Sequence, residues 1–144
     1  MKMLTGSWQF WALLAAIFAA LTAILAKIGV GDINADFATF FRTVVVALAL
    51  ALLLSVLGEW PPLSALSGRG VTFLALSGLA TGASWLCYFR ALKLGNAAQV
   101  APIDKLSVVL VAIFAALFLG EHLSWQSWAG VGLIGLGAII VAAY

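Results

Sequence analysis

The chain has 144 residues, of which 65% are hydrophobic and only 8% are charged. A soluble domain of this length needs a far more polar surface, so the composition excludes a soluble globular protein. The formal net charge is +2, and the Lys and Arg residues are spread along the chain without forming a basic patch. Nucleic-acid binding therefore has no support.

Five long apolar runs fill nearly the whole chain, at residues 8–28, 37–57, 71–92, 97–119 and 125–143. A helix that crosses a membrane needs about 20 residues, and backbone groups inside lipid must be bonded within their own element. The sequence therefore predicts an all-α protein with five transmembrane helices, embedded in the lipid bilayer as a single domain over residues 1–144.

The N-terminus could be taken for a signal peptide, because Lys2 precedes an apolar stretch. That stretch continues to Lys27 without a small-residue cleavage site, so we expect it to remain as the first span.

Polar residues between the runs predict where the helices begin and end. Asp36 is a plausible N-cap of the second helix, and Ser124 can cap the fifth. Pro61 and Pro62 follow the second run and rule out a continuing helix there.

Three charged residues lie deep inside the spans, where charge is costly and commonly functional. Measured from the same side, Arg42 lies about 8 Å into the second helix, and Asp104 and Lys105 about 11 Å into the fourth. The third helix ends on that side and brings Trp85 and Tyr88 to comparable depths. We predict that these five residues bind a substrate or couple its movement, in a polar vestibule open to one side.

A structural interpretation of the same residues stays open. Asp104 and Lys105 are adjacent, so on a helix they point about 100° apart and do not face each other. In that interpretation Asp104 pairs with Arg42, and Lys105 extends to the membrane interface. Trp85 and Tyr88 are then ordinary packing residues.

Pro102 precedes the charged pair in the fourth run. Proline removes one backbone N–H and frees a carbonyl one turn earlier, which interrupts a helix. Transporters use interrupted helices to offer backbone groups to a substrate. We therefore predict a helix break at this site.

Glycines in two runs predict close packing between helices. Gly78 and Gly82 form a GxxxG pattern in the third run. Gly130, Gly132 and Gly135 spell a dinucleotide-binding pattern, but no strand precedes them and they lie inside a span. Together with Gly137 they indicate a helix face open to close approach.

The sequence contains no nucleophile–base pair, phosphate loop or metal-binding cluster. Cys87 is the single cysteine and His122 the single histidine, so neither has the companions that a metal site needs. We therefore expect neither an enzyme, a metal site nor a cofactor.

Short motifs in the second half of the chain resemble a known family. They are Ala91-Leu92, Ala101-Pro102-Ile103, Leu119-Gly120-Glu121, and Gly130 with the glycine-rich fifth helix. In this order and spacing they are similar to an EamA domain of the drug/metabolite transporter superfamily. The stretch Pro102-Ile103-Asp104-Lys105-Leu106-Ser107 resembles the five-helix, single-domain members of that superfamily.

The resemblance implies a multi-pass transporter of small metabolites in the cell (cytoplasmic) membrane, commonly an exporter, working by alternating access. Many members have ten helices, built from two such domains in inverted orientation. This chain holds one, so we expect an antiparallel homodimer of dual topology, which the weak bias of Lys and Arg between the two sides permits. Asp104, the one carboxylate deep in the bundle, is the candidate for proton coupling.

Other classes of protein remain as alternatives. The chain could be a membrane-embedded structural subunit of a larger complex, whose buried charges pair with a partner. A four-helix small multidrug exporter would carry a Glu in its first helix, which this chain lacks. A channel is also possible, but no filter motif is present.

Overall fold

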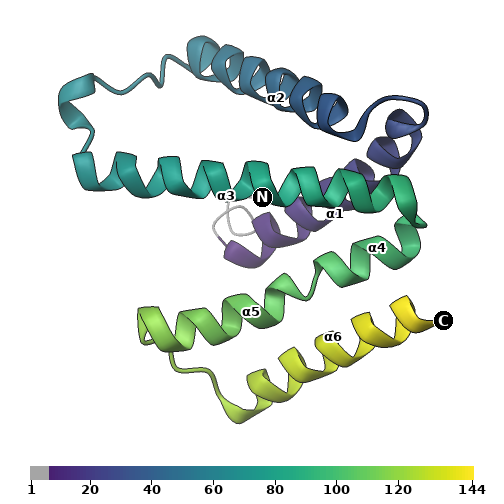
Figure 1. The fold of residues 1–144 in the computed structure, drawn as a ribbon. Helices are drawn as coiled ribbons and strands as arrows, with labels where there is room; N and C mark the ends of the chain where they lie inside the picture. The colour runs from purple at the N-terminus through teal and green to yellow at the C-terminus, as the bar shows by residue number, and fades with distance from the viewer. Residues whose placement is uncertain (1–6) are drawn as a thin grey trace. The chain divides into compact units, whose positions relative to one another are not determined.

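The computed structural model of the chain describes residues 7–144, and every regular element among them is a helix (Figure 1). Within these described residues, five helices are long and apolar enough to cross a membrane, which confirms the predicted fold class. Lys2, used in the signal-peptide interpretation, lies outside the described residues. The elements are α1 (Trp8–Val30), α2 (Ala35–Leu57), η1 (Leu63–Ala65), α3 (Gly68–Leu94), α4 (Ala97–Asp104), α5 (Ser107–Phe114), η2 (Ala115–Leu119) and α6 (Trp125–Ala143).

The elements fall into two compact units along the chain. The first, called here the α2–α3 unit, comprises Ile28–Lys93. The second, called the α4–α6 unit, comprises the chain up to Lys27 together with Leu94–Tyr144. Its fourth span, Ala97–Leu119, is made of α4, α5 and the π-helical segment η2.

The first turn of α2 is capped by Asn34, not by Asp36 as predicted. The Asn34 side-chain oxygen accepts hydrogen bonds from the amides of Asp36 and Phe37, at 2.9 and 3.2 Å. Asn and Asp are comparable caps, and here the helix begins earlier than the apolar run indicated. The correction matters because it leaves the Asp36 carboxylate available for another partner.

Both α2 and the fourth span end in a glycine with a left-handed backbone. Gly58 has a φ of 68° and Gly120 a φ of 67°, a conformation that residues with a Cβ rarely adopt. In each case the next amide bonds back to a carbonyl in the last turn, at 3.0 and 3.1 Å. Gly58 therefore ends α2 before Pro61 is reached.

In the α4–α6 unit, α6 packs along α4 and α5, and the ribbon shows it running beside both (Figure 1). At the contact, a Cβ added to Gly135 would lie 3.2 Å from a methyl group of Val109. The Ser124 hydroxyl accepts a hydrogen bond from the Ser127 amide at 3.2 Å, so the predicted cap of this last helix is confirmed.

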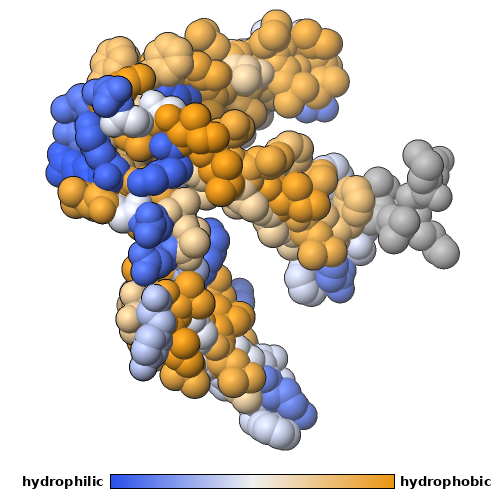
Figure 2. Space-filling model, turned by 90° about the vertical axis from the view of Figure 1, so that its right-hand side faces the viewer, coloured by the Kyte–Doolittle hydropathy of each residue, from blue (hydrophilic) through white to orange (hydrophobic). Residues whose placement is uncertain are grey.

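Most apolar side chains point outward. In each of the five spans, no more than 11% of the most hydrophobic stretch is buried. Hydrophobic residues cover most of the face seen in Figure 2, and hydrophilic residues gather in compact patches. This is the surface that helices present to hydrocarbon, where the backbone is already bonded internally.

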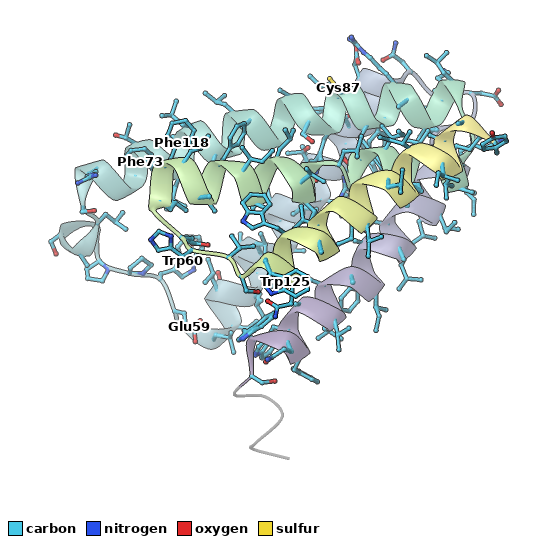
Figure 3. The ribbon with its side chains drawn as sticks, turned by 90° about the horizontal axis from the view of Figure 1, so that it is seen from below. Glu59, Trp60, Phe73, Cys87, Phe118 and Trp125 are labelled. Carbon is cyan, nitrogen blue, oxygen red and sulfur yellow. The ribbon has the colours of Figure 1, made fainter. Side chains whose placement is uncertain are left out.

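Aromatic side chains mark the ends of the spans. Trp8 begins α1, and Figure 3 shows Trp60 in the connection after α2 and Trp125 at the start of α6. All three are more than half exposed. Tryptophan is enriched at the headgroup level of membranes, so these positions fit the boundaries of the hydrocarbon layer.

Candidate substrate-binding site

Arg42 lies against aromatic rings of α3. Its guanidinium carbon is 4.1 Å from the centre of the Trp85 ring and 5.7 Å from that of Phe89. Tyr88 lies within range of electrostatic interaction with the same group. The structure therefore brings together three of the five predicted site residues, Arg42, Trp85 and Tyr88, in the α2–α3 unit.

Phe89 is a member of this cluster that the sequence analysis missed. It is 3% exposed and forms the buried side of the aromatic surface. Residues four apart on a helix share a face, so Trp85 and Phe89 form a pattern visible in the sequence. The sequence does not predict which residue of α2 contacts that face.

Asp104 and Lys105 belong to the α4–α6 unit and form an ion pair. The Lys105 Nζ lies 3.2 Å from Asp104 Oδ2, and the two side chains are 54% and 35% exposed, respectively. The expectation that they do not face each other was wrong. It assumed a continuous helix, whereas α4 ends at Asp104 and Lys105 lies in a turn, from which its long side chain folds back.

The fourth span is interrupted just after the charged pair. The Val108 amide bonds to the carbonyl of Lys105, three residues back, in place of that of Asp104. The Lys105 amide itself is shared between the carbonyls of Ala101 and Pro102, at 3.2 and 3.1 Å. The predicted break therefore exists, but it lies three residues beyond Pro102, which sits inside α4.

A second set of charged side chains joins helix ends. Arg90 binds Asp36 through two hydrogen bonds of 2.9 and 2.8 Å, and the Lys93 ammonium donates to the Ile33 carbonyl at 2.8 Å. In the other unit, Lys27 donates to the carbonyl of Gly95 at 2.8 Å. The pairing of Asp36 with Arg90 was not predicted from the sequence, because Asp36 was expected to cap α2.

The EamA-like transporter family matches residues 6–143, nearly the whole chain. The chain belongs to the EamA-like transporter family. It is 60% identical over 141 residues to a Sinorhizobium protein described as "Uncharacterized transporter in cobO 3'region", a match that covers 98% of this chain and 100% of the relative. No solved structure matches.

Membership of the EamA-like family confirms the resemblance found in the motifs, and it identifies a multi-pass membrane transporter and not an enzyme. One of those motifs now has a physical reason. The Gly120 of Leu119-Gly120-Glu121 supplies the left-handed turn that ends the fourth span. In this EamA-like chain, no group of three or more His, Cys, Asp or Glu side chains within residues 7–144 could hold a metal ion.

The glycines of the EamA-like chain differ in their surroundings. A Cβ added at Gly78, Gly82, Gly130 or Gly137 would meet nothing within 4 Å, whereas at Gly135 it would meet Val109. Of these five glycines, Gly135 alone lies close to a neighbouring helix of its own unit. The packing predicted for the other four remains a prediction.

Proposed function

We propose that this EamA-like transporter carries a small metabolite by alternating access, with export as the expected direction, in the cell (cytoplasmic) membrane. The observation that carries the proposal is the interruption of the fourth span beside Asp104 and Lys105. Ionisable groups inside a span are costly and commonly functional, and an interrupted helix beside them can offer backbone groups to a substrate.

The interruption supports a substrate site in two ways. It tightens the backbone between Asp104 and Ser107, where the amides of Leu106 and Val108 bond to carbonyls three residues back in place of four, and the Lys105 side chain reaches the neighbouring carboxylate. Discontinuous helices near the middle of the membrane are where many secondary transporters bind substrate and coupling ions.

Asp104 is the group that we propose carries a proton. Its carboxylate is half-buried and forms an ion pair with Lys105, the one ion pair seen among the described residues of the α4–α6 unit. Protonation of Asp104 would release Lys105, and deprotonation would restore the pair. Such an exchange links proton binding to the local structure of the broken helix.

We further propose that two copies work as an antiparallel homodimer. One chain has five spans, and alternating access commonly rests on two repeats of inverted orientation. The outward apolar faces of the spans and the unfilled space at Gly130 and Gly137 offer surface for a second copy. The Lys and Arg residues are only weakly biased between the two sides, which imposes little preference for one orientation.

The topology of the C-terminus tests the dimer. Two reporters, each active on a different side of the membrane, are fused separately after Tyr144. Signal from both constructs is expected, because the chain should insert in both orientations. Signal from one alone would refute the antiparallel homodimer and direct the search to an oppositely oriented partner.

Proton-coupled flux tests the transport mechanism independently. Purified protein is reconstituted into liposomes that enclose a pH-sensitive dye, and pools of amino acids, organic acids and amines are added outside. At least one pool is expected to produce a proton flux that empty liposomes lack. Solute uptake without any proton flux would refute the coupling while leaving transport intact.

A further inference from the structure

The guanidinium of Arg42 is held by ring contacts and makes no hydrogen bond within the α2–α3 unit, although it has five N–H donors. Its contacts there are the faces of Trp85 and Phe89 and the nearby Tyr88. Stacking on a ring occupies a face of the guanidinium and leaves its edge, where the donors lie, without an acceptor. Arg42 is half-buried and about 11 Å into α2, a helix long and apolar enough to cross a membrane.

Carboxylates of the same unit do not supply the acceptor. Asp36 is bound at both oxygens by Arg90, and both ion pairs found in residues 7–144 involve other cations. A charged group with several unbonded donors is unfavourable in a membrane. The arrangement is therefore stable when an oxyanion from outside the α2–α3 unit meets the edge of the guanidinium.

The charge at this site selects the class of oxyanion. Arg90 is neutralised by Asp36, Lys93 is bonded to a backbone carbonyl, and Arg69 lies in the first turn of α3, at its opposite end. Arg42 thus offers one positive charge among aromatic rings. A monocarboxylate matches that charge and the two-pronged donor geometry, whereas a dianion would keep an uncompensated charge in a medium of low dielectric constant.

We propose that Arg42, oriented by Trp85 and Phe89, binds the carboxylate of a monoanionic organic solute. That the bound solute is also the transported cargo rests on the transport function proposed above. The binding itself does not depend on that function. This site narrows the substrate class from acids, zwitterions or amines to solutes that present a single carboxylate to Arg42.

Binding of simple probes to the purified full-length protein tests the inference. Benzoate is the monocarboxylate, benzamide its neutral isostere and benzylamine its cationic counterpart. The dissociation constant of each is obtained from the rise in melting temperature with probe concentration. We expect benzoate to bind the wild-type chain, and Arg42→Gln to weaken it about 10- to 100-fold, as expected for two lost charge-assisted hydrogen bonds.

Two further variants separate binding from folding. Arg42→Lys keeps the charge but loses the two-pronged geometry, so benzoate binding should fall although the protein remains folded. Arg69→Gln is the matched control, because Arg69 also lies near a ring, 5.8 Å from that of Phe73, yet is exposed in the first turn of α3. Arg69→Gln should leave benzoate binding unchanged.

A lipid phosphate could present the same chemistry to Arg42. The measurement is therefore repeated in nanodiscs of phosphatidylcholine and of phosphatidylglycerol. Benzoate binding that depends on Arg42 in both supports the solute. Stabilisation by phosphatidylglycerol that depends on Arg42, with no response to benzoate, would overturn the proposal and assign the site to lipid.

Other outcomes separate this inference from the proposed function. Equal stabilisation by benzoate and benzamide, or unchanged benzoate binding in Arg42→Gln, would overturn the carboxylate site even if solute flux is observed. Binding of benzoate that depends on Arg42, in a protein that moves no solute, would support the site and count against transport.

Discussion

The two units of the chain hold their helices in different ways. In the α2–α3 unit the contacts between helices are made by side chains, with Asp36 bound to Arg90 and Arg42 stacked on Trp85. In the α4–α6 unit the backbones approach closely, and Gly135 faces Val109 with almost no space between. One unit depends on long polar and aromatic groups, and the other on small residues.

The difference shows where each unit can change. Long side chains can exchange partners while their helices move, whereas a glycine contact fixes the distance between two helices. In the α4–α6 unit the ladder of backbone hydrogen bonds changes instead at the break after Asp104, where the Val108 amide bonds to the carbonyl three residues back.

Loss of the Asp104 charge should have the largest effect. Asp104→Asn removes the carboxyl group that we propose carries the proton and keeps its shape, so proton-coupled flux should fall below about 1% of the wild-type value, since such a group contributes roughly 100-fold or more. The measurement is dye-reported proton flux in proteoliposomes. Glu121→Gln is the control, because Glu121 lies outside the helices at the end of the fourth span. Unchanged flux in Asp104→Asn would refute the coupling role.

Filling the glycine contact tests the packing of the α4–α6 unit. Gly135→Leu places a large side chain where even a Cβ is 3.2 Å from Val109, and it should destabilise the fold by about 1–3 kcal/mol. Thermal unfolding in detergent measures the loss.

Gly137→Leu is the matched variant, because nothing lies within 4 Å of a Cβ there. It should leave the melting temperature of the single chain near that of the wild type and lower the fraction of dimer seen by crosslinking. Equal destabilisation by Gly135→Leu and Gly137→Leu would contradict the distinction between contacts inside the chain and contacts between copies.

In each of the two units, one span ends in a glycine with a left-handed backbone. Gly58→Ala and Gly120→Ala should each lower the free energy of unfolding by about 1–2 kcal/mol, the cost of this backbone conformation for a residue with a Cβ. Gly29→Ala is the control, since Gly29 is helical with open space around it, and it should be neutral or slightly stabilising. A loss of unfolding free energy in only one of these two variants would show that the two turns are not equivalent.

The sequence predicted the five spans because membrane length and apolar composition leave few alternatives to a helix. It also predicted the Ser124 cap and a break in the fourth span. Asn34 was missed because two neighbouring residues were chemically suitable caps. The stacking of Arg42 on Trp85 and Phe89 was also missed, because the rotation of α2 against α3 depends on tertiary packing that no local pattern records.

The smallest expected effect comes from the exposed ion pair in the α2–α3 unit. Asp36→Asn removes one partner of Arg90, and because both side chains are about half exposed or more, water and salt weaken their attraction. The melting temperature should fall slightly at low salt and match that of the wild type at about 1 M salt, where the Debye length is about 3 Å. Asp32→Asn, in the preceding connection, makes the same charge change without removing a partner of an ion pair. It should leave the melting temperature unchanged at both salt concentrations. A fall that persists at high salt would mean that Asp36 acts through the hydrogen-bond geometry at the start of α2, and that the α2–α3 unit is held more rigidly than its exposed contacts indicate.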